Sequence, residues 1–360
     1  MASGWRSARS DAGSVALAPI ELFLPSKQEG SMVVSVLIST RNREERLLPL
    51  FDALARLEIP AGMEWELLVI DNGSTDRTGE MLRLEKDKGR LPLVCLEEPL
   101  PGKSRALNLA IKRARGELVV LTDDDVEPSV GWLKAYYEAA VARPDIDGFA
   151  GKVLPLWEGD IPQWLHTEGE FAWPRGIINC RDFGNEEHLL TASVIPGGVN
   201  TALRRSVMET MGEFRTDLGP GTMVPYAEDT EYMKRLYSLG GTYLYLPDAL
   251  ILHRNATERM TRSYAAKWMY DAARCQIIAF KAASNAPKIF GIPRYLFNQA
   301  VRRLLSWWVE PRTLHRFKKK LHLSQTLGEI EGYRFLERHR VNSHDTKSGS
   351  ARLTCKDSAP

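Results

Sequence analysis

Short, almost wholly apolar runs alternate with amphipathic stretches along the first half of this chain, and this alternation restricts the fold more than any other feature. The runs Met32–Ile38, Trp65–Ile70, Leu93–Leu96 and Glu117–Thr122 are each followed by residues that are apolar at helical spacing. Strands that are apolar on both faces are typical of parallel sheets covered by helices. The pattern predicts a doubly wound, mostly parallel α/β domain, whose ligands bind at the carboxyl ends of the strands.

The rest of the chain departs from this alternation. Residues 151–255 contain a proline- and glycine-rich stretch and predict a more open second half of the same domain, whose first half is residues 32–150. Residues 256–340 predict a helical, basic and aromatic C-terminal region. Residues 1–31 and 341–360 carry small or polar side chains without periodicity, so we expect two loose tails.

The composition excludes several classes of protein. A net charge of +2 gives no general attraction to nucleic acid. No window offers the roughly 18 uncharged apolar residues that cross a bilayer, and the apolar stretch Val15–Ile20 is too short for a signal peptide. The cysteines are too far apart for a zinc site or a disulfide framework, which favours a reducing, cytoplasmic setting. They are Cys95, Cys180, Cys275 and Cys355.

Three consecutive aspartates, Asp123, Asp124 and Asp125, follow the fourth apolar run. Like charges at the mouth of a buried strand are unfavourable unless a cation or hydrogen bonds offset them. A helix N-cap or a solvated turn is the alternative, although Pro128 and Ser129 already supply a helix start. Asp123 and Asp125 can point to one side, so that one binds a divalent ion and the other orients a ribose or metal-bound water.

Polar residues also follow the first two apolar runs. Thr40 and Asn42 come after the first, and Asp71 and Asn72 after the second. The carboxylate of Asp71 is suited to accept the imino hydrogen of a pyrimidine base. Each group alone is equally typical of a local turn. Their position on adjacent strand ends favours a nucleotide site.

A helix is predicted to open at Pro101–Ser104, with Lys103 and Arg105 beside its first turn. A helix N-terminus flanked by cations is suited to an anion such as a pyrophosphate. The segment is not a P-loop, and no Gly-x-Gly-x-x-Gly fingerprint follows the first strand. This argues against a kinase-like phosphotransferase and against a dehydrogenase.

Taken together, four segments resemble family 2 glycosyltransferases with the GT-A fold, in order and in spacing. The resemblance covers about residues 32–255, and it implies a nucleotide-binding half (32–150) and an acceptor half (151–255). It further implies inverting, metal-assisted transfer from a uridine-type or similar nucleotide sugar, with Mg or Mn as the ion. The four segments are residues 34–42, 69–76, 102–108 and 121–128.

The resemblance also implies roles for particular residues. Asp229 would be the general base, with Glu228 positioning it, although acids in a first helical turn also favour the helix dipole. His253 would be a further metal ligand, but a lone histidine after a strand is often structural. A small-residue acceptor loop is implied at Gly197, Gly198 and Asn200, where a plain turn is the alternative. The predicted donor-binding residues are Thr40, Asn42, Asp71, Asn72, Lys103, Arg105, Asn108 and Asp124, and the predicted metal ligands are Asp123, Asp125 and His253.

Residues 288–320 contain nine basic residues and only one acid, Glu310, interleaved with aromatic and aliphatic side chains. A basic amphipathic helix with tryptophans is suited to an anionic membrane surface. A docking helix with a solvated basic face is the alternative. A membrane surface would suit a lipid-linked acceptor, so we expect a cytoplasmic enzyme that is peripheral on the inner face of the cell membrane.

The sequence therefore predicts a glycosyltransferase that moves a sugar to a hydroxyl acceptor, a saccharide or a lipid-linked molecule, in cell-surface polysaccharide or glycolipid synthesis. A nucleotidyltransferase of related fold is one rival, but it should carry a glycine-rich, basic loop after the first strand, which Ser39–Arg43 lacks. A non-catalytic membrane- or polysaccharide-binding protein is the other. The acids Asp123, Asp125 and Asp229 argue against it.

Overall fold

The computed structural model describes residues 32–165, 176–281 and 284–349. The tail predicted at residues 1–31 and the last cysteine, Cys355, lie outside the described residues. Everything below concerns the chain from Met32 onward.

Four parallel strands form the first part of the sheet, in the order β3-β2-β1-β4. They are β1 (Val33–Thr40), β2 (Glu64–Asp71), β3 (Leu93–Glu97) and β4 (Leu118–Thr122). Every residue of β4 is buried, as expected for a strand with helices on both sides.

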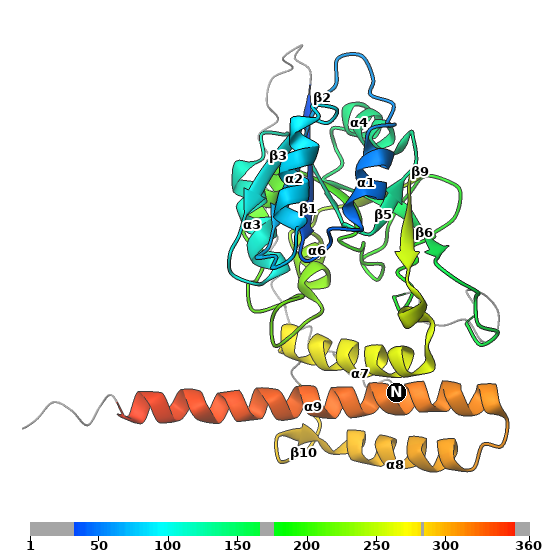
Figure 1. Cartoon of the computed structure of the whole chain (residues 1–360). Coiled ribbons are helices and arrows are strands. Elements are labelled where there is room, and N and C mark those ends of the chain that lie inside the picture. Colours follow the sequence, from blue (N-terminus) through cyan, green and yellow to red (C-terminus); the bar gives the residue numbers. More distant parts are fainter. Residues whose placement is uncertain (1–31, 166–175, 282–283, 350–360) are drawn as a thin grey trace, which may run out of the picture. The chain divides into compact units, whose positions relative to one another are not determined.

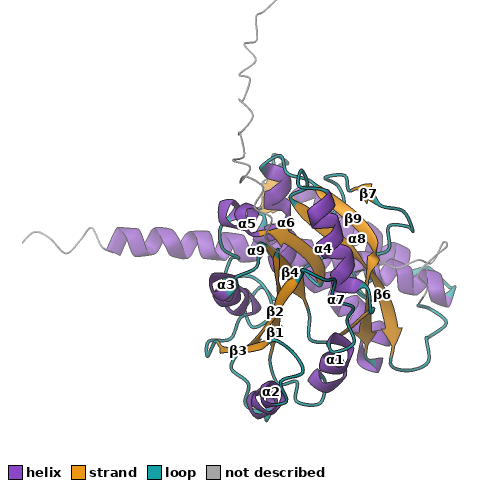
Figure 2. Cartoon of the chain, turned by 90° about the horizontal axis from the view of Figure 1, so that it is seen from above, coloured by secondary structure: helices purple, strands orange, loops and turns teal. Residues whose placement is uncertain are grey.

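Four helices connect and cover these strands, on both faces of the sheet (Figure 2). Side chains of β1 alternate between two apolar clusters: Val36 and Ile38 pack with α1 and α4, whereas Leu37 packs with α3. This confirms the predicted doubly wound α/β domain. The helices are α1 (Leu47–Leu54), α2 (Thr78–Asp87), α3 (Lys103–Arg113) and α4 (Trp132–Ala142).

The second part of the sheet is mixed. β8 (Asn200–Arg204) runs antiparallel to β4, and the sheet continues through β6 (Gly148–Trp157), β9 (Tyr243–Asn255) and β5 (Val126–Pro128). A two-residue strand, β7 (His188–Leu189), also pairs with β9. The long strand β9 therefore brings its far end next to β5, which directly follows the three aspartates. Two helices flank this part: α5 (Arg205–Met211) and α6 (Glu228–Ser238).

The C-terminal region is helical, as predicted. After the short 3₁₀ helix η1 (Thr257–Met260), α7 (Arg262–Ala279) begins at Thr261, whose hydroxyl accepts a hydrogen bond from the Tyr264 amide at 3.2 Å. A small hairpin follows, formed by β10 (Lys288–Ile289) and β11 (Ile292–Pro293). The last two helices are α8 (Arg294–Trp308) and α9 (Thr313–Gly349).

These last helices are stacked, with α9 lying between α7 and α8 (Figure 1). The helix α7 joins them to the sheet domain through apolar clusters that contain Trp164, Leu165, Val224 and Ala227. α9 continues to Gly349, into the stretch for which the sequence predicts a loose tail. None of the helices in the described part of the chain is long and apolar enough to cross a membrane.

Candidate active site

The carboxyl ends of β1, β2 and β4 meet at one edge of the sheet. Thr40, the last residue of β1, pairs in register with Asp71, the last residue of β2. On the other side of β1, Ile38 pairs with Thr122, the last residue of β4. The polar residues that follow the three strands are therefore neighbours in space, as the sequence predicts for a sheet of this kind.

Asp123, Asp125 and His253 form a group whose ligand atoms all lie within 4.8 Å of one another. His253 is brought there by β9, because it pairs with Val126 of β5 immediately after the aspartates. The imidazole Nε2 lies 3.2 Å from Asp125 Oδ1, and His253 is almost fully buried. Two carboxylates and an imidazole are a donor set that suits Mn²⁺ and, through the oxygens, Mg²⁺.

The charge of Asp125 is stabilised by its neighbours. Burial raises the pKa of this carboxyl, but the hydrogen bond with His253 and the nearby guanidinium groups of Arg259 and Arg43 outweigh burial and leave the pKa below its usual range. Arg259 lies 3.4 Å from Asp125 Oδ2. Asp125 therefore stays ionised, which a metal ligand requires.

Asp123 is bonded to the ammonium of Lys103, at the start of α3. Burial lowers the pKa of Lys103, but the carboxylates of Asp123 and Glu228 outweigh burial and raise it. Lys103 thus brings a fixed positive charge to the edge of the three-residue group, where it is bonded to Asp123 and feels the charges of Glu228 and Asp229. This is the side of the site on which an anion would meet both a cation and a helix N-terminus.

Asp124 points away from this group. Its Oδ2 accepts a hydrogen bond from Thr40 Oγ1 at 2.7 Å and lies 3.6 Å from Arg43 Nε. Burial, reinforced by the charge of Asp125, raises the pKa of Asp124 to about 6. Asp124 and Thr40 therefore tie the loop after β1 to the aspartates and leave Asp123 and Asp125 to face His253.

Asp229 and Glu228 open α6, and their charges act on Lys103. The Gly198 amide donates to Asp229 Oδ2 at 3.1 Å, and a Cβ at Gly198 would lie only 2.9 Å from Asp229 Cβ. Glycine is therefore required for this close approach. Burial, together with the charge of Asp229, raises the pKa of Glu228 to about 8, so Glu228 holds a proton near neutral pH beside a half-buried Asp229.

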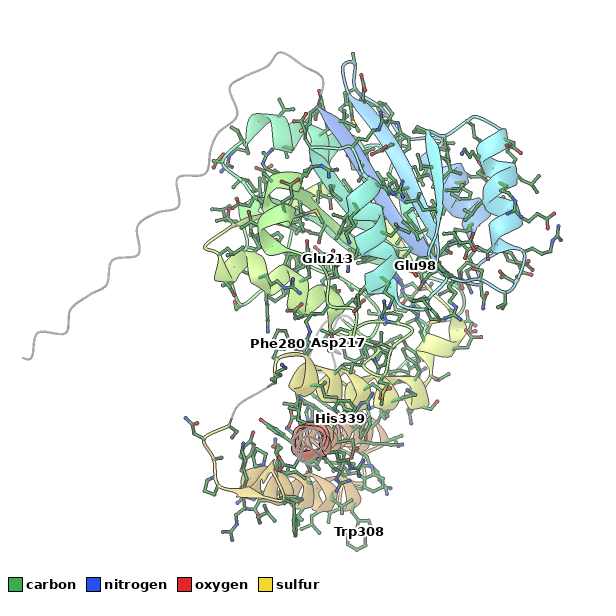
Figure 3. The ribbon with its side chains drawn as sticks, turned by 90° about the vertical axis from the view of Figure 1, so that its left-hand side faces the viewer. Glu98, Glu213, Asp217, Phe280, Trp308 and His339 are labelled. Atoms are coloured by element: carbon green, nitrogen blue, oxygen red, sulfur yellow. The ribbon has the colours of Figure 1, made fainter. Side chains whose placement is uncertain are left out.

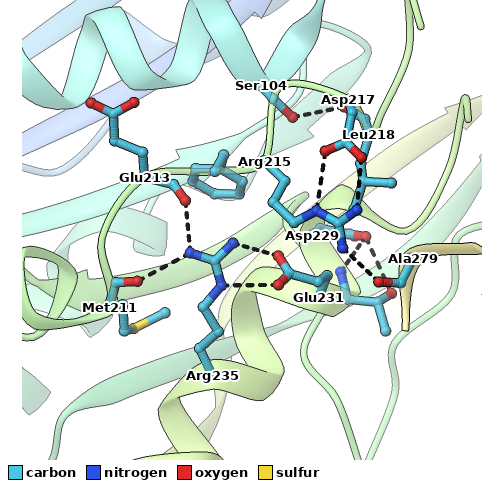
Figure 4. A network of polar contacts seen from close by, with 12 residues as sticks. Ser104, Met211, Glu213, Arg215, Asp217, Leu218, Asp229, Glu231, Arg235 and Ala279 are labelled. Atoms are coloured by element: carbon cyan, nitrogen blue, oxygen red, sulfur yellow. Dashed lines mark hydrogen bonds and ion pairs between the residues drawn. The ribbon is translucent and has the colours of Figure 1, made fainter. Parts of the chain in front are cut away.

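A network of polar contacts holds α6 in place (Figure 4). Arg235 donates to the carbonyl oxygens of Met211 at 3.1 Å and Glu213 at 2.7 Å. In the loop that follows α5, Arg215 donates to the carbonyl oxygen of Ala279, at the end of α7. Arg235, in the last turn of α6, thus ties this helix to the end of α5 and the residues after it, and Arg215 ties those residues to the end of α7.

Three predicted binding residues use their side chains inside the protein. Asn72 donates to the carbonyl oxygens of Glu98 and Leu100 and accepts from the Gly102 amide at 2.8 Å. Asn108 pairs with both backbone groups of Phe214. Asn200 is only 2% exposed, and its amide is fully engaged. Its partners are Trp132, Tyr136, Lys152 and Ala249.

The remaining predicted residues differ in how far their side chains are exposed to solvent. Asn42 has a positive φ of 53°, and its Oδ1 accepts from the Thr75 amide at 2.8 Å, which ties the loops after β1 and β2 together. Asp71 Oδ1 accepts from the Ser74 amide at 2.9 Å. Arg105 is exposed, and Gly197 is buried with its carbonyl oxygen bonded to Thr201 Oγ1. Among these, Asn42 and Arg105 are exposed and Asp71 is half-buried, so all three remain accessible to a ligand.

Sequence reasoning missed a cationic cavity of about 420 Å³ beside Asp125. Four arginines line it, two from the loop after β1 and two from the end of β9 and η1. The sequence does show pairs of arginines near the ends of two predicted strands, which could have indicated this cavity. Exposed arginines are, however, common on protein surfaces in general. The lining residues are Arg43, Arg46, Asp125, Arg254, Ala256, Glu258, Arg259 and Tyr264.

Comparison with known proteins identifies the domain. Residues 35–211 match the family described as glycosyl transferase family 2. A probable glycosyltransferase, YdaM of Bacillus subtilis, is 26% identical over 234 residues, which are 60% of this chain and 49% of YdaM. The poly-beta-1,6-N-acetyl-D-glucosamine synthase of Staphylococcus epidermidis is 33% identical over 202 residues, which are 56% of this chain and 47% of that protein. The matches thus span about half the length of these relatives.

A solved structure supports the fold. The crystal structure of GalNAc-T7 with UDP, GalNAc and Mn²⁺ superimposes with a TM-score of 0.54 and 15% identity, over 88% of this chain and 58% of that one. At this identity the likeness concerns the fold alone. Together with the family match and the geometry of the strand ends, it leads to one conclusion: the chain belongs to glycosyltransferase family 2 and has the GT-A fold.

Proposed function

We propose that this enzyme transfers a sugar from a nucleotide-sugar donor to a hydroxyl group of an acceptor, with inversion and with the help of Mg²⁺ or Mn²⁺. One observation carries the proposal. Asp123, which belongs to the group Asp123, Asp125 and His253, is bonded to Lys103, and the charges of Glu228 and Asp229 also act on this lysine, so a candidate metal site and a candidate base lie near the same cation. Inverting transfer needs a base and a leaving-group site at such neighbouring positions.

Asp123, Asp125 and His253 fit a divalent ion. Their three ligand atoms converge, two of the side chains are buried, and Asp125 stays ionised. When bound, the ion would supply positive charge that stabilises the departing nucleoside diphosphate. Lys103 supports the same end, because its ammonium faces Asp123 and lies at a helix N-terminus.

The donor has candidate contacts at the strand ends and in the cationic cavity. Asp71 offers a carboxylate to the base, as the family resemblance implies. The arginines of the cavity are suited to phosphate oxygens, because guanidinium groups bind phosphate through paired hydrogen bonds. Arg46 is held by Glu158 at 2.7 Å and Arg254 by Glu127 at 3.2 Å. Arg43 and Arg259 make longer contacts, 3.6 Å to Asp124 and 3.4 Å to Asp125, so they are the first candidates.

The acceptor hydroxyl would lie against Asp229. Asp229 takes the proton as the acceptor oxygen forms its bond to the anomeric carbon, while the bond from that carbon to the diphosphate oxygen breaks on the opposite face. The Gly198 amide holds Asp229 Oδ2 in position. Glu228, neutral near pH 7, adds no second negative charge beside Asp229.

The acceptor we propose is a growing saccharide or a lipid-linked sugar in cell-surface polysaccharide synthesis. The name of the relative from Staphylococcus epidermidis supports this, since it is a polysaccharide synthase. The proposal covers the sugar-transfer step only.

Donor hydrolysis tests this function directly. The purified chain is incubated with a panel of nucleotide sugars in Mg²⁺, in Mn²⁺ and in chelator, and the released nucleoside diphosphate is measured. We expect one or a few donors to be consumed only with metal. Proton NMR of the glycosylated product should show an anomeric configuration opposite to that of the donor. Activity that is unchanged in chelator would exclude metal assistance, and a retained configuration would exclude inversion.

A further inference from the structure

The outer face of α8 is apolar although it faces away from the protein. Leu296 is the buried residue of this helix, whereas Val301 and Leu305 are each 56% exposed and Trp308 is 71% exposed. Spacings of four and three residues put Val301, Leu305 and Trp308 on one stripe of the helix. The opposite side of α8 packs on α9 (Figure 1), and Trp308 points away from the ribbon (Figure 3).

The neighbouring hairpin adds an aromatic side chain in a costly position. Phe290, in the turn between β10 and β11, is 88% exposed and has a φ of 51°. A bulky side chain at positive φ is unusual, and here its exposure brings no packing energy in return. A partner that accepts apolar side chains at this surface would supply the missing stabilisation.

The charges of the segment that carries this face are mostly positive. The segment from Lys288 to Lys320 has Glu310 as its only acid. Glu310 is 5% exposed and is bound by Arg312 at 2.8 Å and Lys319 at 2.7 Å, so its charge is compensated within the protein. The exposed cations are Lys288, Arg294, Arg302, Arg316 and Lys320, together with the side of Arg312 that faces solvent.

We propose that this α8 surface, formed by Phe290, Val301, Leu305, Trp308 and Arg302, binds an anionic lipid bilayer. Exposed apolar side chains flanked by exposed cations match the apolar interior and the negative headgroups of such a bilayer. A second copy of the chain fits less well, because two copies of a face of one charge sign would repel each other. Complementary charge thus selects lipid over self-association.

Bilayer binding would also position the candidate active site. Tyr264 of α7 lines the cationic cavity, α7 packs on α9, and α9 packs on α8. A stack of three helices therefore connects the bilayer-binding face to the site. If the proposed function holds, this stack would keep the site close to a lipid-linked acceptor. The binding itself does not depend on that function.

Vesicle flotation tests the proposal with the full chain. We expect flotation with vesicles of phosphatidylcholine and phosphatidylglycerol, a loss of flotation with phosphatidylcholine alone, and a fall in binding as salt screens the headgroups. Val301→Asp and Arg302→Glu should each lower the bound fraction by about fivefold or more, because each places a negative charge at the surface.

Two matched variants serve as controls. Val141 of α4 is 58% exposed, close to the 56% of Val301, so Val141→Asp makes the same change on another helix. Arg83→Glu makes the same charge change as Arg302→Glu, but at an exposed arginine of α2. Both controls should float like the unchanged chain. Equal losses in the control variants, or no flotation on anionic vesicles, would overturn the proposal.

Light scattering after size-exclusion chromatography tests the alternative that a second copy of the chain covers the α8 surface. A dimer that Val301→Asp abolishes and Val141→Asp preserves, without vesicle binding, would assign the surface to a second copy and overturn the lipid proposal. Donor hydrolysis in detergent-free buffer is measured on the same samples. Hydrolysis that persists without flotation would refute bilayer binding alone, whereas flotation without hydrolysis would refute the proposed function alone.

Discussion

Charges in the candidate active site and on the α8 surface are arranged in opposite ways. In the site, cations and acids face each other at short range and are partly or fully buried, as with Lys103 and Asp123 or Arg259 and Asp125. In the segment that carries the α8 surface, the one acid, Glu310, is already paired with Arg312 and Lys319. The exposed charges of that segment are therefore positive. Paired charges held at fixed positions at the edge of the sheet suit a small ligand. Unpaired cations among apolar side chains suit an extended surface such as a bilayer.

The comparison predicts the largest effect at Asp229. Asp229→Asn should lower turnover by about 10³-fold, because a general base contributes on the order of 10² to 10⁴ to a rate. The Michaelis constant for the donor should change little. Donor hydrolysis and transfer to a saccharide acceptor are the measurements.

Glu231→Gln is the control for Asp229→Asn. Glu231 is also an acid of the first turn of α6, and it interacts with the helix dipole in the same way. If both variants lose activity equally, the acids serve the helix and Asp229 is not the base.

The next largest effect is expected at Asp125. Asp125→Asn should reduce metal-dependent turnover by about 10²-fold and raise the Mn²⁺ concentration that gives half-maximal rate. Isothermal titration of Mn²⁺ into the unchanged and substituted chains checks the binding separately from the rate. Glu127→Gln removes a carboxylate two residues away and should leave Mn²⁺ binding intact. Equal Mn²⁺ affinity in the Asp125→Asn variant would remove this residue from the ligand set.

Glu228 predicts a change of stability with pH. Its pKa in the folded chain, about 8, lies above the ordinary value of 4.5, so the folded state binds the proton more tightly than the unfolded state does. The associated stability is complete below pH 4.5 and is lost as pH rises through 8. Between pH 6 and pH 9, linkage gives a loss of about 3 kcal/mol.

Urea unfolding in chelator measures this loss. Glu228→Gln mimics the neutral acid, so its free energy of unfolding should fall less than that of the unchanged chain over the same range. Glu187→Gln, an exposed acid, is the control and should follow the unchanged chain. Parallel pH curves for the unchanged chain and Glu228→Gln would show that Glu228 is ionised at pH 7.

Much of the fold could be predicted from sequence because the parallel strands β1, β2 and β4 are largely buried on both faces. Runs such as Val33–Ile38 and Leu118–Leu121 then carry a signal that does not depend on the rest of the chain. The mixed strands β6, β8 and β9 gave no comparable signal. Their pairing depends on contacts between distant residues, such as Val126 with His253.

The candidate site was predictable for the same reason, but only in part. Asp71 ends β2 and the three aspartates directly follow β4, and both strands belong to the alternating pattern of the first half of the chain. We could therefore expect these residues to lie at the same edge of the sheet. Asn200 was expected in an acceptor loop, yet it satisfies Trp132 and Tyr136 inside the core, which no spacing in the sequence reveals. The arginine cavity was missed because its two halves lie about two hundred residues apart and meet only through β5 and β9.

A smaller effect on activity is expected at the arginine cavity. Arg259→Met should raise the Michaelis constant for the donor by about tenfold, which corresponds to the loss of one charge-assisted contact with phosphate. The turnover number should change less. Arg262→Met, a neighbouring exposed arginine at the start of α7, is the control and should leave both constants unchanged. An unchanged Michaelis constant for Arg259→Met would separate the cavity from donor binding.

The smallest effect should come from the α8 surface in the absence of lipid. Trp308 is 71% exposed, so Trp308→Ser should change the free energy of unfolding by less than about 0.5 kcal/mol. Trp132 is completely buried and bonded to Asn200 at 2.8 Å, and Trp132→Ser should cost about 3 kcal/mol or more. Urea unfolding of both variants makes the measurement. If Trp308→Ser destabilises the chain as strongly as Trp132→Ser does, Trp308 packs within the protein, and the α8 surface is not available to a bilayer.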